Sequence, residues 1–281
     1  MKSSRIHPVA SRLTGHGHQP RTKGGNRISP GADSEWPSRA TVAGIAVTAT
    51  TRDDAVQRIL NAARTPEPAS FHFINAWTIS LASNDPALKA LLNDSTAVFP
   101  DGKPLTMAAR LRTPAAHQIR GPAAFEDCFF HGQRLGVRHF LLGSTPETLD
   151  RLVARLLDRY PATQIAGVYS PPYRPLEASE QKFQDSLIKA SGANIVWVGL
   201  GTPKQDFEAT RIAASTGLTT AAVGAAFDFS AGAKRQAPHW MTTVGLEWLF
   251  RLLSEPRRLW KRYLLGNPSF VAAVVKHWRD Q

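Results

Sequence analysis

Short apolar runs alternate with stretches of helical periodicity from about residue 41 onward. Residues 137–142 form one such run, and the Gly-Ser-Thr-Pro turn that follows is typical of a helix start with Pro146 near its first position. Behind that turn, apolar side chains recur at the spacing of one helix face: Leu149, Val153, Leu156 and Leu157. The repeating unit is therefore a strand followed by a helix.

The same unit recurs further along the chain. The apolar run "ANIVWVGLG" (193–201) precedes the helical pattern "TPKQDFEATRIAASTG" (202–217), and "LTTAAVGAAFDFSAG" (218–232) supplies another buried strand with a glycine-bearing exit. Strands that alternate with helices predict a Rossmann-like α/β fold, in which a mostly parallel sheet is flanked by helices.

Ligands of such sheets bind beyond the carboxyl ends of the strands, so the loops at those ends are the candidate site. Three of them carry glycine: Gly143–Pro146, Gly199–Gln205 and Gly224–Gly232. Each glycine is also explained by a tight turn between a strand and a helix. The "GLG" of the second loop lacks the third glycine of a dinucleotide fingerprint, and Pro203 occupies the loop, so a dinucleotide-dependent enzyme is disfavoured.

The segment "FPDGKPL" (99–105) places a carboxylate, Asp101, between Pro100 and Gly102. One interpretation is a turn, because proline fixes φ, aspartate bonds its own backbone and glycine accepts a positive φ. The other is that Asp101 performs chemistry. The local sequence leaves both open.

A basic helical segment follows residue 244, so we expect an α/β domain at 41–244 and a C-terminal helical appendage at 245–281. Apolar residues recur with helical spacing in the appendage, and Pro256 can break it into two helices. At about 100° per residue, Arg251, Arg258 and Arg262 share one side. Such a stripe is a solvated face, a phosphate clamp or a membrane-docking surface.

The formal net charge of +12 over 281 residues is concentrated at the two ends of the chain. Residues 1–40 lack an apolar signal segment, and their Gly, Pro, Ser and basic residues predict a disordered basic arm. No run approaches the ~18 apolar residues of a membrane span. The single cysteine, Cys128, excludes a disulfide framework and indicates a reducing compartment, the cytosol by default.

Four blocks in this order resemble the WecG/TagA/CpsF family of glycosyltransferases. They are "FINAWTISLASNDPALKALLNDSTAVFPDGKPL", "GLGTPKQDFE", "GAAFDFSAGAKRQAP" and "GLEWLFRLLSEPRRLWKRY". The resemblance, over about residues 41–265, implies an inverting transfer from a UDP-sugar to a polyprenyl-diphosphate-linked acceptor in cell-surface polysaccharide biosynthesis. The transferred sugar would be N-acetylmannosamine, its uronic acid or a hexose. The enzyme would be cytoplasmic and peripheral on the inner face of the cell membrane.

The resemblance also implies roles for individual residues. Asp101 would be the catalytic base that takes the proton of the acceptor hydroxyl. Asn75 would orient the sugar or the acceptor, although Phe73 stands where the family often has threonine. Asp228 is the second candidate for the base or for sugar recognition, with helix capping as its structural alternative. The remaining substrate-binding positions lie in the strand-end loops: Gly199, Lys204, Gln205 and Gly224.

An Asp-x-Asp motif is absent from the sequence, so no metal and no cofactor is expected. The resemblance assigns the UDP diphosphate to the appendage, with Arg251 and Arg258 as the best matches and Lys261 or Arg262 as the third cation. Expected partners are the UDP-sugar, the lipid-linked acceptor, the membrane surface and a second copy in a homo-oligomer, but no nucleic acid. The alternative function is a non-enzymatic protein that binds nucleic acid or a membrane surface through its basic tails.

Overall fold

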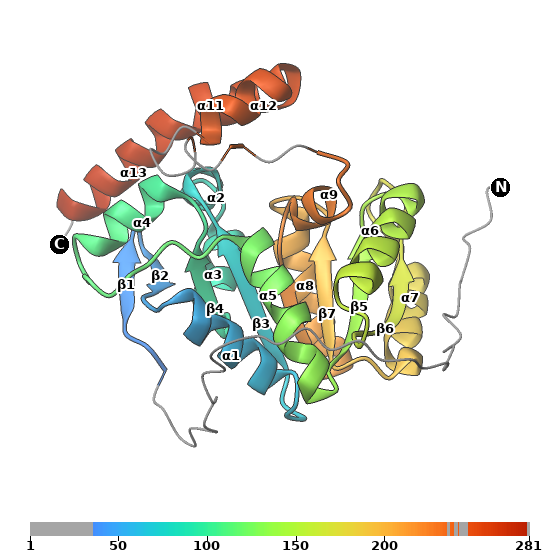
Figure 1. Ribbon diagram of the computed structural model, residues 1–281. Helices are drawn as coiled ribbons and strands as arrows, with labels where there is room; N and C mark the ends of the chain where they lie inside the picture. The colour runs from blue at the N-terminus through green and yellow to red at the C-terminus, as the bar shows by residue number, and fades with distance from the viewer. Residues whose placement is uncertain (1–35, 235–236, 239–240, 242–246, 280–281) are drawn as a thin grey trace, which may run out of the picture.

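The computed structural model describes residues 36–234, 237–238, 241 and 247–279. An antiparallel hairpin opens this part of the chain and precedes a six-stranded parallel sheet (Figure 1). The hairpin strands are β1 (Arg39–Val42) and β2 (Ile45–Thr48). The sheet has the order β4-β3-β8-β7-β5-β6. Its strands are β3 (Ala69–Ile74), β4 (Ala97–Pro100), β5 (Arg138–Gly143), β6 (Gln164–Tyr169), β7 (Ile195–Gly199) and β8 (Thr219–Ala222).

Helices connect these strands and extend beyond the last one. Those of the α/β part are α1 (Arg52–Ala62), α2 (Ala76–Ala82), α3 (Pro86–Asp94), α4 (Lys103–Arg110), α5 (Gly121–Gly132), α6 (Pro146–Arg159), α7 (Ala178–Ser191), α8 (Lys204–Thr216) and α9 (Ala226–Ser230), with a 3-10 turn at Gln133–Leu135. The C-terminal helices are α11 (Glu247–Ser254), α12 (Pro256–Leu264) and α13 (Gly266–Arg279). No helix in the described ranges is long and apolar enough to cross a membrane.

Both faces of the sheet are buried, which is why its strands read as continuous apolar runs. On β5, Leu141 packs into the cluster under α1, α5, α6 and α9, whereas Phe140 and Leu142 pack into the cluster under α7 and α8. The period of two along each strand thus divides the core into two layers. The predicted strand at 137–142 and the helix starting at Pro146 are confirmed as β5 and α6.

The strand order places crevices at the carboxyl edge of the sheet. Strands β5 and β7 are neighbours, but α6 follows β5 on one face and α8 follows β7 on the other. Neighbouring β3 and β8 are likewise followed by α2 and α9 on opposite faces. Chains that leave neighbouring strands in opposite directions open a crevice between them. The predicted Rossmann-like sheet flanked by helices is confirmed.

The C-terminal helices lie beyond this carboxyl edge (Figure 1). The predicted break at Pro256 is confirmed, since α11 ends at Ser254 and α12 begins at Pro256. Helix α13 packs along α2, and its Phe270 is buried in the cluster that also holds the β1–β2 hairpin. Gly266 lies so close to the Trp77 ring that a Cβ there would approach one ring carbon to 2.6 Å. The basic arm predicted at 1–40 falls mostly outside the described residues and stays a prediction.

Candidate active site

A cavity of about 910 Å³ lies between the carboxyl edge of the sheet and the C-terminal helices. Its wall is built from the loops after β3, β4, β5, β6, β7 and β8, together with side chains of α11 and α12. It brings together these predicted site residues: Asn75, Asp101, Gly199, Lys204, Gln205, Gly224, Asp228, Arg251 and Arg262. The side chain of Arg258, which belongs to α12, lies outside the described part of the structure.

Asp101 follows β4 in a loop that is held on three sides. Its backbone N–H donates to the carbonyl of Ile74 at 2.7 Å, and its own carbonyl accepts from Nε2 of Gln118 at 2.6 Å. The carboxylate Oδ1 accepts from the backbone N–H of Gly121, the first residue of α5, at 3.3 Å. The positive end of that helix stabilises negative charge on the carboxylate.

Asn75 follows β3 and forms the N-cap of α2. Its Oδ1 accepts from the backbone N–H of Trp77 at 3.1 Å, and the hydroxyl of Thr78 accepts from the Asn75 backbone N–H at 3.4 Å. This capping box is a structural reason for asparagine at the position. Its oxygen is committed to the helix, so the amide nitrogen is the group with which Asn75 can donate into the cavity.

Lys204 and Gln205 form the first turn of α8, and both order the loops around them. The Lys204 ammonium donates to the carbonyl of Arg174 at 3.2 Å, which ties the loop after β6 to the cavity rim. Gln205 is buried, and its Oε1 accepts from the backbone N–H of Gly201 at 3.1 Å. The Gln205 side chain therefore shapes the loop after β7 while it lines the cavity.

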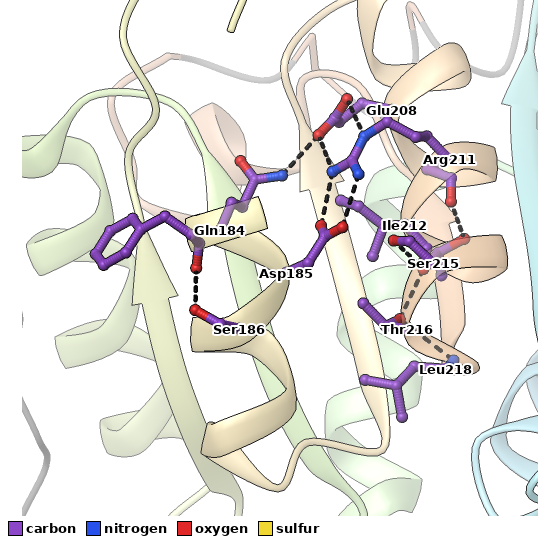
Figure 2. Close-up of polar contacts among 12 residues, drawn as sticks. Gln184, Asp185, Ser186, Glu208, Arg211, Ile212, Ser215, Thr216 and Leu218 are labelled. Atoms are coloured by element: carbon purple, nitrogen blue, oxygen red, sulfur yellow. Dashed lines mark hydrogen bonds and ion pairs between the residues drawn. The ribbon is translucent and has the colours of Figure 1, made fainter. Parts of the chain in front are cut away.

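Helix α8 is itself anchored by a network of charged side chains shared with α7 (Figure 2). Arg211 forms two hydrogen bonds of 2.8 Å with the carboxylate of Asp185 and another of 2.8 Å with Glu208. Burial opposes ionisation of Asp185, but the hydrogen bonds from Arg211 and Ser215 outweigh it and lower its pKa. The hydrogen bonds with Asp185 raise the pKa of Arg211. The helix that presents Lys204 is thereby fixed against its neighbour.

Asp228 stands on α9 and is paired with a lysine. Its Oδ2 lies 2.5 Å from Nζ of Lys234, and the same ammonium lies 3.1 Å from Oε1 of Glu255, the N-cap of α12. On the same short helix, the ring of Phe229 lies under the Arg251 guanidinium at 5.6 Å. We call the Asp228–Lys234–Glu255 set the charge clip. It connects the α/β part of the chain to the C-terminal helices.

A second cavity of about 160 Å³ adjoins the first. Asn75, Asp101, Arg251 and Arg262 line both cavities, so they form the partition between them. The far wall of the small cavity comes from α2, α4 and the C-terminal helices, and includes Trp77, Lys103, Pro104, Trp248, Tyr263 and Asn267. Asp101 therefore borders both cavities.

Sequence reasoning missed several residues of the two cavities. Arg120, the N-cap of α5, lines the large cavity beside Asp101, and Lys103 lines the small one. Arg120 had no motif of its own, because a lone basic residue ahead of a helix is common on any surface. Lys103 stands within "FPDGKPL", where only Asp101 was given a role. Cations nevertheless dominate the charged lining of the large cavity: Arg120, Arg174, Lys204, Arg251 and Arg262, against Asp101 and Asp228. Over the described residues, no group of His, Cys, Asp or Glu is arranged to hold a metal ion.

A cationic cavity at the carboxyl edge of a parallel sheet is typical of α/β proteins that bind anionic small molecules. The pattern described as the glycosyl transferase WecG/TagA/CpsF family matches residues 40–281. A Bacillus spizizenii protein named N-acetylglucosaminyldiphosphoundecaprenol N-acetyl-beta-D-mannosaminyltransferase is 30% identical over 205 residues, which cover 70% of this chain and 75% of the relative. The chain belongs to the WecG/TagA/CpsF family of glycosyltransferases, as the sequence blocks predicted.

Proposed function

We propose that this enzyme transfers N-acetylmannosamine from its UDP derivative to a sugar linked to a polyprenyl diphosphate, with inversion at the anomeric carbon. The observation that carries the proposal is the position of Asp101. Its carboxylate lies at the start of α5 and in the partition between a large and a small cavity. A base that serves two substrates must be accessible to both.

In this assignment the nucleotide sugar occupies the large cavity and the acceptor sugar occupies the small one. The acceptor hydroxyl gives its proton to Asp101 as its oxygen bonds to C1 of the donor sugar. The bond between C1 and the UDP oxygen breaks at the same time, and the electron pair leaves with UDP. Attack from the face opposite UDP inverts the configuration at C1. Asn75, also in the partition, orients one of the two sugars.

The negative charge that develops on UDP needs positive partners. Arg251 and Arg262 line both cavities and belong to α11 and α12, so they can meet the diphosphate from the side of the C-terminal helices. Guanidinium groups bind phosphate through paired donors and supply charge without a metal. We assign Arg258 to the same role on the basis of the family resemblance. Metal independence follows as an expectation: activity should survive treatment with EDTA.

The sugar and the acceptor are assigned from the relative. Its printed name specifies an N-acetylmannosaminyl group and an N-acetylglucosaminyl diphosphoundecaprenol. We extend these to the present chain, with the uronic acid of N-acetylmannosamine and a hexose as the alternative donors. Such an acceptor is anchored in lipid, so we place the enzyme on the cytoplasmic face of the membrane, in polysaccharide biosynthesis of the cell envelope.

The experiment is a transfer assay with the purified full-length chain. UDP-N-acetylmannosamine, UDP-N-acetylmannosaminuronic acid, UDP-glucose and UDP-galactose are each supplied with a short-chain lipid-diphosphate N-acetylglucosamine acceptor. We expect transfer from the first donor and opposite anomeric configurations in donor and product by NMR. Transfer with retained configuration would contradict the mechanism, and transfer from another donor alone would contradict the sugar assignment.

The same preparation tests the non-enzymatic alternative. A nucleic-acid-binding protein would bind any DNA or RNA with a steep dependence on salt and would release no UDP. We expect acceptor-dependent UDP release instead.

A further inference from the structure

Three aromatic side chains line the small cavity of about 160 Å³. Trp77 comes from α2, Trp248 from α11 and Tyr263 from α12. The ring centroids of Trp248 and Tyr263 lie 5.8 Å apart and the ring planes meet at 54°, so the two rings form a corner. We call these three side chains the aromatic cup. None of them has a role in the transfer step described above.

The Trp77 ring joins the aromatic cup to the partition between the cavities. Gly266 of α13 lies so close to this ring that a Cβ there would come to 2.6 Å from one ring carbon. The backbone N–H of Trp77 donates to Oδ1 of Asn75 at 3.1 Å, and Asn75 and Asp101 both belong to the partition. Because the cavity is small, a ligand that lies against the Trp77 ring is a close neighbour of Asp101.

Polar groups complete the cavity wall beside the aromatic cup. Gln118 and Asn267 contribute amides, and Arg251 and Arg262 contribute guanidinium groups. A pyranose sugar matches this combination, because it presents C–H groups on a face of its ring and hydroxyls around its rim. The C–H face packs against aromatic rings, and the hydroxyls exchange hydrogen bonds with amides. An isoprenoid chain would cover the same amides without giving them hydrogen-bond partners.

We propose that the aromatic cup binds the acceptor sugar through the C–H face of its ring. This inference rests on the proposed function, which gives the cavity beside Asp101 a sugar to hold. The sizes of the two cavities favour the acceptor sugar over the nucleotide. Pockets for drug-sized ligands have volumes of about 300–1,000 Å³, a range that includes the large cavity of about 910 Å³ but not the small one.

The covalent structure of the donor also places its uracil away from the aromatic cup. In a UDP-sugar, the ribose and the diphosphate stand between uracil and C1, the carbon that must lie near Asp101. The acceptor hydroxyl, by contrast, must reach Asp101 directly. A stacking surface that borders Asp101 therefore suits the attacking sugar. Because stacking fixes the plane of the acceptor ring, the cup also limits which hydroxyl faces Asp101.

The first experiment measures binding to the full chain by calorimetric titration, with and without UDP. The probes are N-acetylglucosaminyl diphosphate that carries a short alkyl chain, and the same alkyl diphosphate without the sugar. The test variant is Trp248→Leu, which keeps an apolar side chain but removes the ring. Its matched control is Trp260→Leu on α12, because Trp260 is 43% exposed against 41% for Trp248 and lines neither cavity. We expect the Kd for the sugar probe to rise about five- to tenfold in the test variant and to change little in the control.

A second variant separates stacking from general apolar contact. Trp248→Phe keeps an aromatic face, so its Kd for the sugar probe should stay within about threefold of the wild type. An unchanged Kd in Trp248→Leu would overturn the proposal, and so would an equal loss of affinity in Trp260→Leu or in Trp248→Phe. The probe without the sugar should bind wild type and variants alike. If Trp248→Leu weakened both probes equally, the cup would hold the alkyl chain and the proposal would be wrong.

Steady-state kinetics separate this inference from the proposed function. In Trp248→Leu the acceptor KM should rise about as much as the Kd for the sugar probe, whereas the donor KM should change by less than about twofold. A rise in the donor KM with an unchanged acceptor KM would assign the aromatic cup to the nucleotide and overturn the proposal. Absence of transfer by the wild type with every donor would refute the proposed function, while the two probes would still show whether the cup binds a sugar.

Discussion

The α/β part of the chain and the C-terminal helices both contribute to the cavity, but they are held in place differently. The loop of Asp101 and the first turn of α8 stand on a sheet whose two faces are buried in extended apolar clusters. In α11 and α12, by contrast, Leu259 alone is buried among the described hydrophobic side chains. Polar contacts such as the charge clip join these helices to α9. The proposed base is thus held by extensive buried apolar packing, whereas the proposed diphosphate ligands stand on helices that are held mainly by polar contacts.

This difference suggests a division of labour. A base must be held within a narrow range of positions relative to the reacting atoms, and buried apolar packing provides that precision. Groups that bind a nucleotide and then release it benefit from an element that can be displaced at a modest cost in free energy. Substitutions on the two sides should therefore differ in kind, affecting the chemical step on one and substrate affinity on the other.

The largest expected effect is that of Asp101→Asn, on the rigid side. The substitution keeps a side chain that suits the turn and removes the proton acceptor. We expect kcat to fall by about 10²- to 10⁴-fold, with little change in the donor KM. Steady-state kinetics together with thermal unfolding of the variant provide the measurement.

The matched control is Asp228→Asn, which tests the other candidate for the base. Near-normal kcat in Asp101→Asn with a collapse in Asp228→Asn would move the base to α9. That result would also contradict the contrast between the α/β part and the C-terminal helices, because the base would then lie next to the C-terminal helices.

The second effect concerns Arg262→Ala, on the lightly held side. Arg262 lines both cavities, whereas the exposed Lys261 lies over the ring of Trp260, 5.5 Å from its centroid, and lines neither. We expect the Kd for UDP to rise about ten- to a hundredfold in Arg262→Ala, since one charged hydrogen-bonded contact with phosphate is lost. Lys261→Ala should leave it nearly unchanged. Calorimetric titration with UDP decides the matter, and a larger effect for Lys261→Ala would exchange the two assignments.

A third effect reports on the buried core alone. Burial lowers the pKa of His139 from 6.5 to about 3, and its Nδ1 accepts a hydrogen bond from Nε1 of Trp197 at 3.0 Å. Between these two pKa values the unfolded chain binds a proton that the folded chain does not. Protonation of His139 in the unfolded chain therefore costs the folded protein no stability above pH 6.5. Its cost to the free energy of unfolding grows progressively as the pH falls toward 3. Near pH 5.5 the loss should be about 1.4 kcal/mol relative to pH 7.5.

Urea unfolding at the two pH values measures this loss, and His139→Asn is the reference variant. Asparagine keeps an oxygen that can accept from Trp197 but does not titrate in this range. The difference between wild type and variant therefore isolates His139 from the other ionisable groups. An identical pH dependence in both proteins would show that His139 does not cause it.

Most of the architecture could be predicted from the sequence because it rests on local periodicity. The strand at β5, the proline-started α6 and the break at Pro256 all follow from spacing and turn chemistry. The candidate residues also gather in one cavity, since parallel strands send their carboxyl ends to the same edge.

What the sequence left unpredicted depends on contacts between distant segments. Lys234 stands near Glu255 only because the chain returns over α9, and no local pattern encodes that distance. The capping role of Asn75 was overlooked although Thr78, three residues later, completes a capping box. Helix α13 was not distinguished within the C-terminal appendage, because both its inward and its outward side carry apolar residues.

The smallest expected effect tests the charge clip, and with it the boundary between the two regions. Lys234→Met keeps the length of the side chain but removes the cation between Asp228 and Glu255. Because these side chains are partly exposed, we expect a modest result, a rise of about two- to fivefold in the donor KM with kcat nearly unchanged.

Three further measurements separate a positioning role of the clip from a general structural one. Lys234→Arg should restore the donor KM, because arginine can pair with both carboxylates, and the defect of Lys234→Met should shrink at high ionic strength, where the wild-type pairs are also screened. The free energy of unfolding should change by less than about 1 kcal/mol, since no apolar side chain is uncovered. A large fall in kcat without a change in KM would instead mean that the Asp228–Lys234 pair takes part in the chemical step. In that case the lightly held side of the cavity would do more than bind the nucleotide, and the division of labour between the two regions would be wrong.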